Sequence, residues 1–159
     1  MPVINVRVYG VLIDEERGVL VSDELIRGGR YTKFPGGGLE VGEGTRDCLK
    51  REFLEEMDLA VEVGAHLYTT DYYQPSAFHA DHQILSIYYY VTPLEPINTR
   101  ISTEPFDFDE EQMERYRQHG ETESFRFVPW EQLTEDTVNL PIEKRVVQRL
   151  LQDVSPLRG

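Results

Sequence analysis

The chain has 159 residues, and its hydrophobic fraction of 40% is typical of a folded globular domain, which we predict to span residues 1–159 as a single unit. Its formal net charge of -13 disfavours nucleic acid and anionic membranes as partners, because the surface repels polyanions. No apolar run approaches the ~20 residues that cross a bilayer, which also excludes a membrane-spanning helix.

The N-terminal third reads as strands separated by turns. Residues 4–13 and 19–26 are apolar and rich in β-branched side chains, and the segment DEERG between them is typical of a turn, so we predict a hairpin. The segment RYTKF predicts a further short strand, and PGGG after it predicts a flexible loop.

An amphipathic helix is predicted directly after the glycines. Thr45 suits the N-cap position, and Asp47 in the first turn interacts favourably with the helix dipole. Leu49, Phe53 and Met57 recur at four-residue steps and form one apolar stripe. The helix therefore has one side that faces a core.

Two longer strands are predicted over residues 60–73 and 83–93, separated by the polar segment QPSAFHADH. Residues 95–123 are rich in Pro, Asp and Glu and predict an acidic loop or lid, with a short helix at residues 110–119.

The C-terminal part predicts a last strand at SFRFVPW that ends at Pro129, one helical turn at EQL, and an amphipathic helix at PIEKRVVQRLLQD. Together these elements predict a mixed β-sheet with at least two helices, which is an α+β fold.

The helix after the glycines has an unusual acidic face. Glu52, Glu55 and Glu56 are three and four residues apart and therefore share one side of the helix, where like charges cost roughly 0.2–0.5 kcal/mol per pair. Clustered carboxylates suit hard divalent cations such as Mg²⁺ or Mn²⁺. The alternative is a charged helix face that is simply exposed to solvent.

The preceding glycines fit a ligand site as well. Gly36, Gly37 and Gly38 lack side chains, so the backbone can approach a ligand closely, and a free carbonyl there can complete a metal coordination shell.

These residues resemble the signature of the Nudix hydrolases, Gx5Ex7REUxEExGU, in which U is a bulky aliphatic residue. The matching charged and glycine positions are Gly37, Glu43, Arg51, Glu52, Glu55 and Glu56. The chain departs from the signature at Phe53, which is aromatic, and at Asp58, which replaces the final glycine. The resemblance implies an α/β/α sandwich.

The resemblance also implies a reaction and a set of roles. Nudix enzymes are pyrophosphohydrolases, which act on acid anhydrides in phosphorus-containing compounds and cleave a nucleoside diphosphate derivative: a nucleotide, ADP-ribose or a nucleotide sugar. By resemblance, Glu52, Glu55 and Glu56 bind Mg²⁺ or Mn²⁺, with the carbonyl of Gly37 as a further ligand. Arg51 is expected to orient a glutamate by ion pairing, and Glu43 to support the site.

A carboxylate bound to metal is a poor base, so a further acidic residue outside the signature is expected to activate water. Glu121 is our candidate, with Glu123 beside it, and Glu110 and Glu111 are less specific alternatives.

Cations and aromatic residues outside the signature are candidates for substrate contacts. Lys33 and Arg30 precede the glycines and are expected to contact phosphate oxygens. Four aromatic residues offer rings that can stack on a base, although packing is the better interpretation of each: Tyr72, Tyr73, Phe78 and Trp130.

The predicted partner is a phosphorylated small molecule, and by resemblance the protein is expected to form a homodimer. The single cysteine, Cys48, and an N-terminus without the features of a signal peptide predict a cytoplasmic location. Two rival hypotheses remain: a catalytically inactive nucleotide-binding or sensor module with the same fold, and an acidic domain that binds a basic protein.

Overall fold

The computed structural model describes residues 1–158, with side chains through Asp153 in the last helix. The chain forms two compact units. The first contains residues 1–12 and 35–98, and the second contains residues 13–34 and the chain from residue 99 onward.

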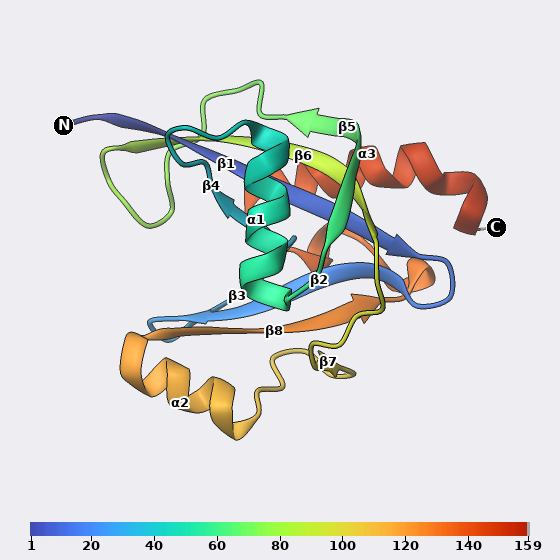
Figure 1. Cartoon of the computed structure of the whole chain (residues 1–159). Helices are drawn as coiled ribbons and strands as arrows, with labels where there is room; N and C mark the ends of the chain where they lie inside the picture. The colour runs from blue at the N-terminus through green and yellow to red at the C-terminus, as the bar shows by residue number, and fades with distance from the viewer. Residues whose placement is uncertain (159) are drawn as a thin grey trace. The chain divides into compact units, whose positions relative to one another are not determined.

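The first unit is a small mixed sheet with one helix, α1 (Thr45–Met57). Its strands are β1 (Val3–Asp14), β4 (Gly36–Gly38), β5 (Val61–Thr69) and β6 (His82–Pro93). Strand β1 pairs in parallel with β6 and antiparallel with β4, and β5 adds to the other side of β6 (Figure 1). Helix α1 contacts β4 and β5, which places the charged helix beside the three glycines.

The second unit begins where the last residues of β1 pair with β2 (Gly18–Ile26) as the predicted hairpin. Strand β2 then lies between β3 (Gly29–Lys33) and β8 (Glu121–Val128), and β7 (Ile101–Ser102) extends the sheet beyond β8. Its helices are α2 (Glu110–His119) and α3 (Pro141–Arg158), with two short 3-10 turns at Trp130–Gln132 and Glu135–Thr137.

The eight strands join in parallel and antiparallel pairs, and residues 1–158 contain three α-helices, which confirms the predicted α+β class with a mixed sheet. Within these residues no helix is both long and apolar enough to cross a membrane.

The apolar stripe of α1 packs as the sequence predicts. Leu49, Phe53 and Met57 are each at most 1% exposed. A Cβ atom on Gly10 of β1 would lie 2.7 Å from the ring of Phe53. Gly10 therefore leaves room for the aromatic ring of Phe53, which stands where the signature has an aliphatic residue.

Three local predictions were wrong. The N-cap of α1 is Gly44, because the hydroxyl of Thr45 instead lies 2.7 Å from that of Tyr89 and is used in a tertiary hydrogen bond. The predicted glycine loop is strand β4, because the backbone of Gly36–Gly38 pairs with β1. Strand β8 begins at Glu121, so the acidic segment ends earlier than predicted.

Asp58 ends α1 in the left-handed backbone conformation, with φ 49° and ψ 41°, and its N–H donates to the carbonyl of Leu54. Because left-handed backbone strains residues that carry a Cβ, we expect Asp58→Gly to raise the free energy of unfolding by about 0.5 kcal/mol, after the larger chain entropy of glycine is subtracted. Urea denaturation measures the change. Asp58→Ala is the control and should be the least stable of the three proteins. A loss of stability in the glycine variant would contradict this explanation.

Candidate active site

Strand β4 and helix α1 hold the signature residues against each other. A Cβ atom on Gly37 would lie 2.5–2.6 Å from the carboxylate atoms of Glu52, closer than real contacts allow. A side chain at position 37 would therefore displace the Glu52 carboxylate, and glycine leaves room for that carboxylate beside the backbone.

The guanidinium of Arg51 gathers the acidic residues. Its Nε and Nη2 donate to the two carboxylate oxygens of Glu43 at 3.0 and 2.8 Å, which is a bidentate pair. Its Nη1 donates to Glu52 at 3.1 Å and to Glu55 at 3.2 Å, and lies 3.7 Å from Glu40. Nη2 also donates to the carbonyl of Gly38 at 3.1 Å, which ties α1 to the glycine strand.

Two groups beside Arg51 have shifted pKa values. Hydrogen bonds from Arg51, and then from the backbone of Glu40, lower the pKa of Glu43 to about 2, so this carboxylate is ionised throughout the neutral range. Burial, followed by the nearby Glu43 carboxylate, raises the pKa of Cys48 to about 12. The single cysteine is therefore a packed thiol and not a nucleophile.

The charges around Arg51 are unbalanced. Four carboxylates contact this one guanidinium, and the side chain of Glu55 is 59% exposed. Within residues 1–158 no three Asp, Glu, His or Cys side chains are already arranged to hold a metal ion. The donors nevertheless fit a hard divalent cation, because they are carboxylate oxygens with surplus negative charge beside a close backbone. The ligand set Gly37, Glu52, Glu55 and Glu56 remains a prediction.

The candidate bases outside the signature lie in the second unit. Glu121 is the exposed first residue of β8, and Glu123 is the third. Burial, followed by the charge of Glu24, raises the pKa of Glu123 to about 7, although Ser22 and Lys33 oppose the shift. No contact of Glu121 distinguishes it from a solvated carboxylate, so its proposed role remains untested.

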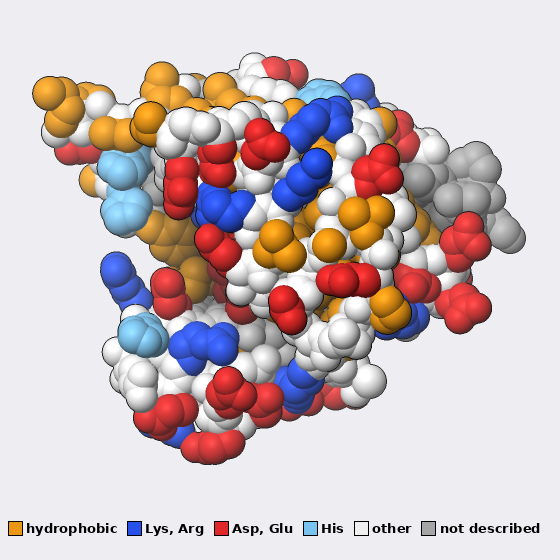
Figure 2. Space-filling model, viewed as in Figure 1, with side chains coloured by type: hydrophobic (Ala, Val, Ile, Leu, Met, Phe, Trp, Pro, Cys, Tyr) orange, Lys and Arg blue, Asp and Glu red, His pale blue; other side chains and the backbone are white. Residues whose placement is uncertain are grey.

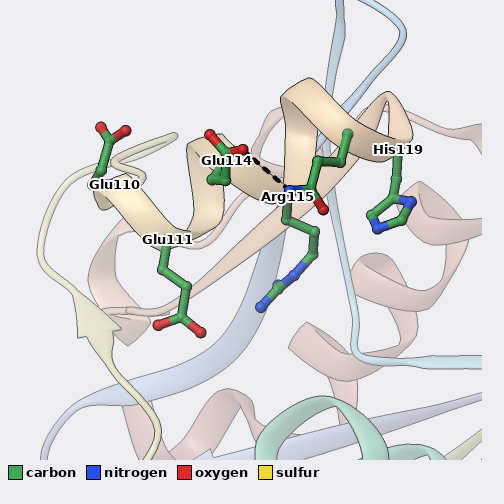
Figure 3. Close-up of a pocket in the computed structure, with 6 residues that line it drawn as sticks. Glu110, Glu111, Glu114, Arg115 and His119 are labelled. Atoms are coloured by element: carbon green, nitrogen blue, oxygen red, sulfur yellow. Dashed lines mark hydrogen bonds between the residues drawn. The ribbon is translucent and has the colours of Figure 1, made fainter.

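The acidic helix α2 has a hollow of about 420 Å³ along one side, and acidic side chains gather over this helix in Figure 2. Glu111, Arg115 and His119 project on the same side of the helix at four-residue spacing, whereas Glu110 points away (Figure 3). Glu110 and Glu111 are the two less specific candidates for the base. Of these, Glu111 lies on the same side of the helix as Arg115 and His119.

The two candidate phosphate-binding cations already have partners in the second unit. The ammonium of Lys33 lies 3.2 Å from a carboxylate oxygen of Glu24, and the residue is 8% exposed. The guanidinium of Arg30 lies over the ring of Phe106, 5.5 Å from its centroid. A phosphate would have to compete with Glu24 for Lys33, and the predicted contacts remain untested.

The candidate stacking residues differ in exposure. Trp130 is 6% exposed, which agrees with packing. Tyr73 is 71% exposed, so the packing interpretation was wrong for this residue, and its ring is accessible to a ligand.

Sequence reasoning missed Ser22 and Glu24 as neighbours of Glu123. A signal was present, because SDE interrupts the apolar strand VLVSDELI, and polar residues inside such a strand usually have partners.

Comparison with known proteins supports the family resemblance that the signature indicates. The model of the NUDIX domain matches residues 3–150. No curated protein shows significant similarity to the chain.

Solved structures share the fold at low sequence identity. A Nudix hydrolase from Nitrosomonas europaea is 16% identical with a TM-score of 0.64, over 96% of this chain and 90% of its own. A MutT protein from Methanosarcina mazei Go1 is 13% identical with a TM-score of 0.64, over 96% of both chains. An ADP-ribose pyrophosphatase from Streptococcus suis 89-1591 is 15% identical with a TM-score of 0.57, over 98% of this chain and 92% of its own. Since the family model covers nearly the whole chain and the charged signature positions are intact, this protein belongs to the Nudix family.

Proposed function

We propose that this chain is a divalent-metal-dependent pyrophosphohydrolase that cleaves the diphosphate linkage of a nucleoside diphosphate derivative: a nucleotide, ADP-ribose or a nucleotide sugar. The observation that carries the proposal is the set of four carboxylates gathered around Arg51, whose negative charge one guanidinium does not balance. If the protein only bound a ligand and held no cation, the repulsion among these carboxylates would lower its stability without any benefit.

A bound Mg²⁺ or Mn²⁺ would neutralise the diphosphate oxygens and lower the pKa of the attacking water. In the proposed site, Glu52, Glu55 and Glu56 would hold the cation, with the carbonyl of Gly37 as a further ligand. Arg51 positions Glu52 and Glu55 through the hydrogen bonds of its Nη1.

The water oxygen forms a bond to one phosphorus as the bridging P–O bond breaks, which yields a nucleoside monophosphate and the phosphorylated remainder. Glu121 is our proposed acceptor of the proton from this water. We further propose that residues 1–159 act as one catalytic domain and that two copies form a homodimer.

A substrate panel tests the activity. The structural relatives include a MutT protein and an ADP-ribose pyrophosphatase, so the panel contains a nucleoside triphosphate, ADP-ribose, a nucleotide sugar and a dinucleoside polyphosphate. We expect Mg²⁺-dependent release of a nucleoside monophosphate from at least one of them, and chelation by EDTA should abolish it, since the carboxylates alone cannot neutralise the diphosphate. Product identity is scored by chromatography.

Saturable binding of a panel member without turnover, at any Mg²⁺ or Mn²⁺ concentration, would instead indicate an inactive binding or sensor module. The absence of both nucleotide binding and Mn²⁺ binding in calorimetry would favour a domain that uses its acidic face to contact a basic protein.

A further inference from the structure

Two acidic residues of the second unit face each other across neighbouring strands. Glu24 of β2 lies directly opposite Glu123 of β8 in the antiparallel register, and Ser22 of β2 lies opposite Lys33 of β3. Ser22 and Glu24 are two residues apart in β2, so their side chains share one face of the sheet. The register thus places two carboxyl groups, one hydroxyl and one ammonium on the same face.

The contacts show that this cluster has more negative than positive charge. The ammonium of Lys33 lies 3.2 Å from Glu24, and the two side chains are only 10% and 18% exposed. The hydroxyl of Ser22, which is fully buried, donates to Oε2 of Glu123 at 3.1 Å. The Lys33 ammonium is paired with Glu24, so Glu123 relies chiefly on a neutral hydroxyl. Like charges directly opposite in a sheet are destabilising.

Charged groups from three elements act on Glu123. Burial is the largest cause of its raised pKa of about 7, and the Glu24 carboxylate on β2 is the next. Ser22 on β2, Lys33 on β3 and Arg115 on α2 each act in the opposite direction, but they do not cancel the first two effects.

We propose that Glu24 and Glu123 form a proton switch in the β2–β8 ladder: the pair holds one proton in mildly acidic solution, and its loss in alkaline solution weakens the pairing of these strands. With the proton bound, one carboxylate faces one ammonium. Without it, two carboxylates on adjacent strands share that ammonium and repel each other. The proposal concerns the second unit alone and holds whether or not the chain is a hydrolase.

The sign of the stability effect follows from the direction of the shift. The pKa of Glu123 is higher in the folded protein than the ordinary glutamate value of 4.5, so folding disfavours its ionised form. The folded state carries no penalty from this group below pH 4.5. The penalty grows between pH 4.5 and pH 7, where the carboxyl group is ionised in the unfolded chain but not in the folded protein, and it is complete above pH 7.

Glu123→Gln tests the switch by urea denaturation at pH 5 and pH 8. Relative to the wild type, the variant should have an unfolding equilibrium constant that is lower by only a few-fold at pH 5, and lower by on the order of 100-fold at pH 8. Glu121→Gln is the matched control, because it removes an exposed carboxylate from the same face of β8, and it should follow the wild-type pH dependence.

Carbon-13 NMR of glutamate-labelled wild-type protein measures the titration without a variant. We expect one carboxyl group, assigned to Glu123 by its absence from the variant spectrum, to titrate with a midpoint near pH 7. Glu24→Gln should lower this midpoint by at least about one unit, because the like charge is removed and Lys33 is released to pair with Glu123. After correction for intrinsic exchange, the amides of β2 and β8 should be less protected at pH 8 than at pH 6.

If every glutamate of the wild-type protein titrates below pH 5.5, the switch does not exist. The proposal would also be overturned if Glu123→Gln and Glu121→Gln had the same pH-dependent stability, or if the protection of β2 and β8 did not change with pH.

Discussion

Replacement of Glu52 by glutamine is expected to lower kcat/KM by at least about 100-fold while the protein stays folded. Its carboxylate lies against the backbone of Gly37 and accepts a hydrogen bond from Nη1 of Arg51 at 3.1 Å. Glutamine preserves the shape and the acceptor for Arg51, but removes the charge that a divalent cation requires. Steady-state kinetics on the best substrate of the panel measures the loss.

Stability and metal binding distinguish a catalytic defect from misfolding. Because the change removes one of four carboxylates crowded around Arg51, the free energy of unfolding should stay within about 0.5 kcal/mol of the wild-type value or rise slightly. Mn²⁺ affinity measured by calorimetry should fall. Glu62→Gln is the matched control in the same unit, since Glu62 is exposed on β5, and it should alter none of the three quantities. Unchanged turnover in Glu52→Gln would show that the metal-ligand assignment is wrong.

The helix that carries the proposed site was predictable because its pattern is local. Leu49, Phe53 and Met57 repeat at the helical period and are buried, and the predicted helix at residues 110–119 coincides with α2. The helix was predicted, but its start was placed one residue late, with Thr45 as the cap, because the hydroxyl of Thr45 has its partner in Tyr89, which is 44 residues away. Periodicity does not encode such a tertiary contact.

The glycine segment shows a second limit of sequence reasoning. Three consecutive glycines are typical of a loop, yet Gly36 to Gly38 pair with β1. A Cβ atom on Gly36 would lie 2.1 Å from the carbonyl oxygen of Val8, so any larger residue would prevent the strands from meeting. Glycine here permits close pairing, and only the position of the neighbouring strand reveals this.

The pairing of Glu24 with Glu123 in the second unit could not be predicted from the sequence, for the same reason. Ser22 and Glu123 form a hydrogen bond across 101 residues of sequence, and their alignment depends on the register of β2 with β8. Sequence reasoning placed Glu121 and Glu123 together before the last strand. In the strand they alternate with Thr122, so their side chains share a face, but only Glu123 lies opposite Glu24.

Removal of the Asp23 carboxylate is expected to lower the free energy of unfolding by about 3–5 kcal/mol, because a largely buried guanidinium is left without its partner. Asp23 is fully buried and accepts hydrogen bonds from Nε and Nη2 of Arg126 at 2.6 and 3.1 Å. It also accepts from the hydroxyl of Thr32 at 2.8 Å and from the backbone N–H of Phe106 at 3.2 Å. One carboxylate thus joins β3, β8 and the segment before α2 to β2.

Asp23→Ala tests this role by urea or thermal unfolding, and Asp136→Ala is the control, since the Asp136 side chain is 99% exposed and its loss should cost less than about 0.5 kcal/mol. Arg126→Leu in the Asp23→Ala background should recover part of the loss, because most of the penalty comes from the unpaired charge and not from the missing ion pair. If the single variant lost less than about 1 kcal/mol, solvent would have to reach Arg126 easily, and the network would not be the anchor of this part of the sheet.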